Sequence, residues 1–367
     1  MACASLNYFV LLILFTSCKG ISRHSIETSY NKGLQAYSDE RWSECIAQFE
    51  ETLHLYKLYK SVFNNCGAKC KSQEVKSKID NHFNDLKMYE SFLNERHCLI
   101  NCRDKDFETV DLQEGLEASI LSNIEERKPY EYLHICYFQM NAVSKAASAA
   151  YTYLLAHPDD TVMNNNLKYY TAQPEVNPNE LVDLESEDYE VLHKLGKESY
   201  NQKKWGETIV AMEEVLTDYF AWEKGCRVSC EHQPEQEWSP DFVITVSNNI
   251  LFLLQCRQQC QSKLSTLGYK SGIEFVADIL NYLQISYYHS SRFEDAAKIV
   301  ASYLAILPDD EDMLLNKDIY SSLVDDSAFT ERSDVVYYFK YDQYEKELLS
   351  HFYNTNTFDL KSNSVKS

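Results

Sequence analysis

The sequence contains few of the residues that interrupt regular structure. Its 367 residues include only nine glycines and seven prolines, and no segment shows sustained alternation of polar and apolar side chains. Glycine and proline are the strongest interrupters of helices, and alternation is the main sign of a half-buried strand. The sequence therefore predicts an all-α fold.

Positive charge is also scarce. Lysine and arginine together number 35, against 56 aspartates and glutamates, which gives a formal net charge of −21. Binding to nucleic acid needs clustered basic side chains that contact phosphates. The composition therefore excludes a nucleic-acid partner, whereas an acidic surface suits a basic partner chain or simply keeps the protein soluble.

Long hydrophobic runs are missing after the first twenty residues. The apolar run from Tyr8 to Phe15 is too short to span a bilayer and fits a secretory signal peptide, which we assign to residues 1–20. The segment that ends at Cys18 also resembles a bacterial lipobox. The C-terminus is not a KDEL-type retention signal, so retention in the endoplasmic reticulum would depend on another chain.

The common catalytic signatures are absent as well. The ten histidines form no H-E-x-x-H, the serines no G-x-S-x-G, and the glycines no phosphate-binding loop. One short match remains, because His157-Pro158-Asp159 has the His-x-Asp pattern of the iron site in 2-oxoglutarate oxygenases. We nevertheless expect no catalytic residue, no cofactor and no bound metal.

What the sequence does contain is an internal duplication. The pattern P-D-D-x-x-M-x-x-N-x-x-x-Y occupies Pro158–Tyr170 and recurs 150 residues later at Pro308–Tyr320. The equivalent of His157 is Leu307, while the proline and the aspartates persist. A loop that ends a helical pair therefore explains the pattern better than an iron site does.

A second register, offset by 163 residues, pairs Gly33 with Gly196 and the residues that follow each glycine. From residue 29 to residue 59, apolar side chains recur at three- and four-residue steps with a break near residues 38–41, which predicts a helix, a turn and a helix. The spacing is tetratricopeptide-like. We predict helical modules at residues 26–172 and 189–325, an acidic linker at 173–188, and a C-terminal extension at 326–367.

Eight of the twelve cysteines form four Cys-x-x-x-Cys pairs. Cysteines four residues apart lie on one helix face, so two facing antiparallel helices would be joined by two parallel bridges, outer to inner. The predicted bridges are Cys66–Cys102, Cys70–Cys98, Cys226–Cys260 and Cys230–Cys256. Cysteines in such numbers behind a signal peptide indicate an oxidising compartment.

Other roles for these cysteines fit the spacing less well. Structural zinc sites favour closer spacings, and thiol oxidoreductases carry Cys-x-x-Cys at a helix N-terminus rather than pairs in mid-helix. Cys45 and Cys136 stand outside the four pairs and correspond to Thr208 and Ser286 in the second module. We therefore expect Cys45 and Cys136 to be buried free thiols.

Two groups stand out among the 27 tyrosines. Those that recur in both modules are expected in the core: Tyr37, Tyr132, Tyr137, Tyr153 and Tyr170. Aromatic grooves can dock segments in the polyproline II conformation. The candidates for such a peptide-facing surface are Tyr56, Tyr59, Tyr219, Tyr337 and Tyr338.

Together these features resemble the leprecan family. The resemblance rests on the helical pairs at Gly33 and Gly196, the four Cys-x-x-x-Cys pairs, the duplicated Pro-Asp-Asp pattern and the segment Tyr282-Leu283-Gln284-x-x-Tyr287-Tyr288. It implies a non-catalytic helper that associates with a prolyl 3-hydroxylase and cyclophilin B to modify and chaperone procollagen in the endoplasmic reticulum lumen. Catalytic members of the family add a C-terminal oxygenase domain, and we expect none before Ser367.

Three alternatives stay open from the sequence. A family member of the same architecture is associated with collagen lysyl hydroxylation. A secreted matrix interaction protein without an enzyme partner would have the same sequence features. The least favoured alternative is a divergent iron and 2-oxoglutarate oxygenase that uses His157 and Asp159.

Overall fold

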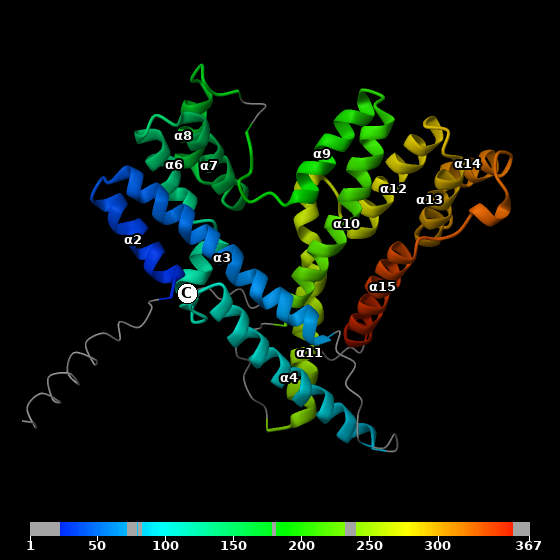
Figure 1. Ribbon diagram of the computed structural model, residues 1–367, viewed down its shortest axis with the longest axis horizontal. Helices are drawn as coiled ribbons and strands as arrows, with labels where there is room; N and C mark the ends of the chain where they lie inside the picture. The colour runs from blue at the N-terminus through cyan, green and yellow to red at the C-terminus, as the bar shows by residue number, and fades with distance from the viewer. Residues whose placement is uncertain (1–22, 72–78, 80–82, 178–180, 232–239, 355–367) are drawn as a thin grey trace, which may run out of the picture. The chain divides into compact units, whose positions relative to one another are not determined.

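The computed structural model describes residues 23–71, 79, 83–177, 181–231 and 240–354 (Figure 1). The predicted signal peptide at 1–20 and residues 355–367 of the predicted extension lie outside the described residues. The chain divides into two compact units, residues 1–185 (unit 1) and 186–367 (unit 2). The division falls within the segment that the sequence predicts as a linker.

Both units are helical. Unit 1 contains α2 (Ile26–Ser38), α3 (Trp42–Lys71), α4 (Asn84–Thr109), α5 (Ala118–Glu125), α6 (Pro129–Gln139), α7 (Val143–Ala156) and α8 (Thr161–Thr171). Unit 2 contains α9 (Asp188–Asn201), α10 (Trp205–Ser229), α11 (Phe242–Gln259), α12 (Gly272–His289), α13 (Phe293–Ile306), α14 (Glu311–Ser321), α15 (Ser333–Asn354) and the short 3₁₀ helices η2 (Cys260–Leu267) and η3 (Asp326–Ala328). Within the described ranges the only β pairing is a single bridge between His24 and Leu112, and no helix combines the length and apolar character of a membrane span.

The two units stack their helices in the same order. In unit 1, α3 packs against α2, α4 and α6, and α7 packs against α6 and α8. In unit 2, α10 packs against α9, α11 and α12, and α13 packs against α12 and α14 (Figure 1). Each unit is therefore a row of antiparallel helical pairs with one long hairpin, α3/α4 or α10/α11, beside it.

The turns inside the helical pairs use residues other than glycine in the left-handed region. Glu40 and Lys203 have φ values of 57° and 59°, and Asn141 and Ser291 have values of 58° and 60°. These are equivalent positions in the two units. Because this conformation costs a non-glycine residue about 1 kcal/mol, its recurrence indicates that packing of the paired helices dictates the turn.

The first helical pair of each unit crosses closely at a glycine. A Cβ atom on Gly33 would lie 3.0 Å from the ring of Phe49, and one on Gly196 would lie 2.8 Å from Cε of Met212. Phe49 and Met212 are themselves equivalent residues. The glycines therefore keep α2 against α3 and α9 against α10.

The described part of the C-terminal extension belongs to the unit 2 core. Helix α15 packs against α11 and α13, and it buries Val335, Tyr338 and Leu349. Local sequence could not place this helix, because its apolar residues match partners that are roughly a hundred residues earlier in the chain.

Candidate functional site

The Pro-Asp-Asp pattern caps a helix in both units. Oδ1 of Asp160 accepts a hydrogen bond from the backbone N–H of Met163 at 2.9 Å, and Asp310 accepts the same bond from Met313 at 2.9 Å. Aspartate is among the preferred residues at this N-cap position. The pattern therefore begins α8 and α14, as the duplication suggests.

His157 is engaged in a local structural contact. Its Nε2 lies 2.7 Å from the carbonyl oxygen of Glu126, and its ring centroid lies 4.5 Å from that of Tyr153. Asp159 is exposed in the loop beyond it. These contacts account for His157 without an iron ion.

A buried polar contact closes the end of the duplicated pattern. Nδ1 of His134 lies 3.0 Å from the Tyr170 hydroxyl, and the Tyr320 hydroxyl donates to Oε1 of Gln284 at the equivalent place in unit 2. Burial lowers the pKa of His134 to about 4 and raises the pKa of Tyr170 to about 12. His134 is therefore neutral at physiological pH, like the glutamine that replaces it in unit 2.

The repeated residues line an open groove on unit 2. A cavity of about 630 Å³ lies over α12 and α14, with Tyr303 of α13 at its side. Inside it, the rings of Tyr288 and Tyr320 stack with centroids 5.4 Å apart. Amide side chains of Asn281 and Asn316 stand in the same cavity.

The lining suits an extended peptide better than a small charged substrate. Amide groups can donate to and accept from a peptide backbone, and the exposed ring of Tyr288 offers an apolar face to a proline ring. The acids Asp310 and Asp312 border the same cavity and favour a neutral or basic segment. We name this set of residues the unit 2 groove.

The Cys-x-x-x-Cys pairs form two staples in each unit. In unit 1 both staples join α3 to α4, and in unit 2 they join the end of α10 to the end of α11 and the start of η2. The bonds are Cys66–Cys102, Cys70–Cys98, Cys226–Cys260 and Cys230–Cys256. Cys230 caps α10 and Cys260 opens η2, so these two cysteines do not lie in mid-helix as the sequence suggests.

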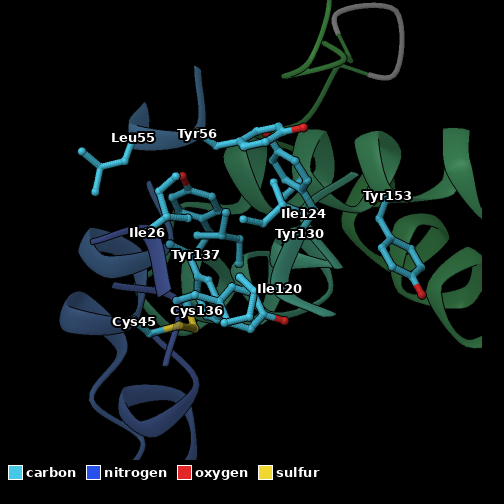
Figure 2. Packing of buried hydrophobic residues seen from close by; sticks show 14 of the residues in the cluster. Ile26, Cys45, Leu55, Tyr56, Ile120, Ile124, Tyr130, Cys136, Tyr137 and Tyr153 are labelled. Atoms are coloured by element: carbon cyan, nitrogen blue, oxygen red, sulfur yellow. A yellow bond between two sulfur atoms is a disulfide. The ribbon is translucent and has the colours of Figure 1, made fainter. Parts of the chain in front are cut away.

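A fifth disulfide corrects a sequence-based expectation. Cys45 and Cys136 are bonded to each other inside the core of unit 1 (Figure 2) and are not free thiols. The two helices that carry them, α3 and α6, are held in contact by stacked rings of Phe49 and Tyr132, 5.3 Å apart. Each aromatic residue lies four positions from a cysteine, so the same contact that stacks the rings brings the sulfurs together.

A signal for this fifth bond exists in the sequence. Both cysteines of the pair are replaced together in the second module, by Thr208 and Ser286. A bonded pair is expected to be replaced together, because one cysteine cannot form the disulfide after the other has been replaced. The same joint replacement is also compatible with two free thiols, which is what we expected, and the disulfide shows that expectation to be wrong.

The described residues contain one group of three side chains that could hold a metal ion, namely Cys66, Cys102 and Asp106. Oδ2 of Asp106 lies 3.4 Å from Sγ of Cys66 and 3.7 Å from Sγ of Cys102. The two sulfurs are bonded to each other, so no thiolate is left as a ligand. A single carboxylate does not make a zinc site.

The structure corrects the peptide-facing interpretation for three tyrosines. Tyr219 and Tyr338 are buried in unit 2 with their hydroxyl oxygens 3.1 Å apart, because α15 lies over α10 there. Tyr56 is buried in the core of unit 1 (Figure 2). Tyr59 is partly buried, and Tyr337 is 68% exposed, so a peptide contact at these two residues stays a prediction.

A buried network of charges ties α15 to the stapled hairpin of unit 2. Arg227 donates to Glu223 at 2.7 Å and to Glu345, and Arg257 donates to Glu345 at 3.2 Å. Burial opposes the charge of Arg227, but the neighbouring carboxylates raise its pKa above the usual range. Breaking such a network leaves a buried charge without a partner and costs about 3–5 kcal/mol, so α15 is firmly held.

Sequence comparisons agree with this architecture. A profile described as the Leprecan family TPR-like repeat region matches residues 25–324. The chain is 30% identical to the Cartilage-associated protein of Homo sapiens over 333 residues, which covers 88% of this chain and 82% of that protein. It is 28% identical to the Endoplasmic reticulum protein SC65 of Homo sapiens over 299 residues, covering 79% of this chain and 68% of that protein.

A third relative is longer than this chain. The Prolyl 3-hydroxylase 1 of Gallus gallus is 27% identical over 342 residues. The aligned region covers 89% of this chain but only 46% of that protein.

Proposed function

The chain belongs to the leprecan family, and we propose on that premise that it is a non-catalytic scaffold subunit of a collagen-modifying complex in the endoplasmic reticulum lumen. In this proposal it binds a prolyl 3-hydroxylase and cyclophilin B, and it contacts unfolded procollagen chains. The observation that carries the proposal is the similarity to Cartilage-associated protein along most of both chains. The relative named Endoplasmic reticulum protein SC65 supports the proposed compartment.

The construction of each unit supports a scaffold. Two disulfide staples and close glycine crossings hold the helices before any partner arrives. A preorganised surface avoids the entropy cost of ordering at binding, which is a general property of stacked helical repeats. Two histidines are also held in structural contacts, since His134 is buried and neutral and His157 contacts a backbone carbonyl.

The unit 2 groove is the place where we propose that procollagen makes contact. A polyproline II segment carries unpaired backbone carbonyls and apolar proline rings. Asn281 and Asn316 can donate to the carbonyls while Tyr288 packs against a ring. Replacing Tyr288 and Asn316 with alanine should weaken binding of a proline-rich procollagen peptide in fluorescence titration and leave the fold unchanged by circular dichroism.

Affinity purification and collagen analysis test the proposal together. A tagged full-length chain expressed in its own secretory pathway should recover a prolyl 3-hydroxylase, and cells that lack the chain should produce collagen with less 3-hydroxyproline. A loss of hydroxylysine with unchanged 3-hydroxyproline would instead assign the chain to lysyl hydroxylation. Accumulation in the medium without an enzyme partner would favour a matrix protein and count against the proposal.

Recombinant protein tests the remaining enzyme alternative. The purified chain is expected to show no turnover of 2-oxoglutarate with iron and a procollagen peptide. Turnover that His157→Ala abolishes would show that the chain is an oxygenase.

A further inference from the structure

In unit 2, helix α15 covers one face of α11. Leu251 and Leu254 of α11 pack against Leu349 of α15 in a buried cluster. One turn further along α11, Nε2 of Gln258 donates to Glu345 at 3.1 Å. This face of the stapled hairpin therefore binds a helix, and we call such a helix-binding face a seat.

The cysteines align α4 of unit 1 with α11. Cys98 and Cys102 of α4 are equivalent to Cys256 and Cys260, at a constant offset of 158 residues. With this alignment, Leu251, Leu254 and Gln258 correspond to Leu93, Arg96 and Ile100. Leu251 is 8% exposed, whereas its equivalent Leu93 is 66% exposed, so the seat on α4 is open.

One face of α4 carries exposed apolar residues from Leu86 to Ile100. Exposed apolar residues follow one another at three- and four-residue steps, apart from Arg96, and so lie on one side of the helix. We call this set the α4 stripe: Leu86, Tyr89, Leu93 and Ile100.

The path of the chain explains why no helix among the described residues of unit 1 covers this face. The backbone N–H of Leu184 donates to the Thr152 hydroxyl at 2.8 Å, and that of Arg332 donates to the Ser302 hydroxyl at 2.9 Å. Thr152 and Ser302 are equivalent, so the chain follows one route to this point in both units. After Arg332 it forms α15 of the same unit, but after Leu184 the next helix, α9, belongs to unit 2.

Two arginines and a glutamate that contact α15 are replaced by apolar residues in unit 1, whereas Gln261, which donates to Asp342, is replaced by Arg103. Aligned through the cysteines, the positions of Glu223, Arg227 and Arg257 hold Phe63, Gly67 and Leu99. Phe63 and Gly67 are buried in α3, the hairpin partner of α4. A helix bound here would therefore find no arginine at the two positions with which Glu345 of α15 pairs.

We propose that the α4 stripe seats an amphipathic helix of a partner chain in the way that α11 seats α15. The occupant has an apolar stripe and lacks an acid at the place of Glu345, with which α15 meets Arg227 and Arg257. Helices of this kind bind grooves through apolar anchors at three- and four-residue steps. The inference rests on the proposed function in one respect, because it takes the partner to be the prolyl 3-hydroxylase subunit.

Co-purification of the full-length chain with the co-expressed hydroxylase tests the proposal. Leu93→Glu combined with Ile100→Glu should reduce recovery of the hydroxylase at least tenfold, since the substitutions place carboxylates against an apolar helix. Leu93→Gln adds no charge and should give a smaller loss. Val243→Glu on α11 is the matched control. Val243 is 69% exposed and lies in the equivalent hairpin of unit 2, outside the α4 stripe. Recovery of the hydroxylase should not change in this variant.

The outcomes separate this inference from the proposed function. Equal recovery by wild type and the double variant would overturn the α4 seat while leaving the scaffold function intact. Failure of wild type itself to recover the hydroxylase would instead count against the proposed function. Circular dichroism and thermal unfolding establish that each variant is folded.

A defined peptide tests the seat without the hydroxylase. The probe is the segment 333–354 of α15 carrying Glu345→Leu, which removes the acid whose arginine partners are absent from the equivalent positions of α3 and α4. It should bind the full chain, at least tenfold more weakly after Leu93→Glu and unchanged after Val243→Glu. Absence of binding, or binding that Leu93→Glu does not weaken, would refute the proposed seat on α4. A photocrosslinker placed at position 93 gives a second test. A crosslink that yields only a homodimer or a link within the chain would also refute the proposal.

Discussion

The hydroxyl of Tyr137 on α6 donates a hydrogen bond to Oε1 of Glu50 on α3 at 2.7 Å, and Tyr287 donates to Glu213 in the same way at 2.9 Å. The glutamates are 163 residues apart and the tyrosines 150, so unit 1 carries thirteen more residues between them. The bond nevertheless recurs. It joins the first helical pair of each unit to the second, although the segment between the two residues differs in length between the units.

Removing this hydroxyl should have a modest cost. Tyr137→Phe is expected to lower the free energy of unfolding by about 1 kcal/mol, which is the net value of a typical hydrogen bond. The cost stays modest because Glu50 is exposed and its carboxylate remains hydrated in the variant. Tyr287→Phe should cost a similar amount, since Glu213 retains its ion pair with Arg332 at 2.7 Å. Urea unfolding followed by circular dichroism measures both, and a loss above about 3 kcal/mol would mean that the hydroxyl does more than bridge two pairs.

Stability should fall in acid through His134. Burial lowers its pKa to about 4 in the folded chain, while an unfolded histidine titrates near 6.5. Between these values the unfolded chain binds a proton that the folded chain does not, so the contribution is fully present above pH 6.5 and is lost as the pH falls toward 4.

His134→Gln, which copies Gln284 of unit 2, should remove this dependence, worth up to about 3 kcal/mol. Thermal unfolding at pH 7 and pH 4.5 compares wild type with the variant. His193, with a pKa lowered to about 4 mainly by burial, remains in both proteins as the internal reference. An unchanged acid sensitivity would show that His134 titrates normally when folded.

The fifth disulfide should be removable only at a large cost. Cys45→Thr with Cys136→Ser installs the residues of the second module, and the bond it removes closes a loop with a sequence separation of 91. Chain entropy predicts a loss of about 4 kcal/mol for such a loop. Thermal unfolding with and without reductant should show the loss in the oxidised protein alone.

The reverse exchange should create a bond in unit 2. Thr208→Cys with Ser286→Cys places cysteines at the positions that bond in unit 1. Ser286 Oγ is buried and makes no hydrogen bond in the structure, so its replacement leaves no donor stranded. Peptide mapping without reduction should detect the new bridge; two free thiols would mean that α10 and α12 sit differently from α3 and α6.

The two crossing glycines should differ in tolerance. Gly33→Ala pushes Cβ against the Phe49 ring, which is stacked on Tyr132 and cannot turn aside, and should cost about 1–3 kcal/mol. Gly196→Ala meets the flexible end of Met212 and gains helix propensity, so it should be close to neutral. Equal losses in urea unfolding would argue that the neighbouring Ala211 limits the second site as well.

The sequence was enough for several features that a few neighbouring residues encode. The i, i+4 spacing of Cys66 and Cys70 predicts which face of α3 carries them, and antiparallel geometry then selects Cys102 and Cys98 as partners. The Pro-Asp-Asp pattern predicts a helix start because Asp160 caps its own next turn. The duplication distinguished residues with a structural role from residues that could be catalytic.

Only the tertiary structure decided the contacts between residues far apart in the chain. The bond from Arg227 to Glu345 spans 118 residues and the bond from Tyr219 to Tyr338 spans 119, so no local pattern marks either pair. For that reason the packing of α15 and the burial of three candidate tyrosines could not be predicted from the sequence. The pairing of Cys45 with Cys136 is marked only by their joint replacement in the second module. Helical periodicity follows from backbone hydrogen bonds a few residues apart, whereas the choice of which helix covers which face depends on packing that only the assembled unit defines.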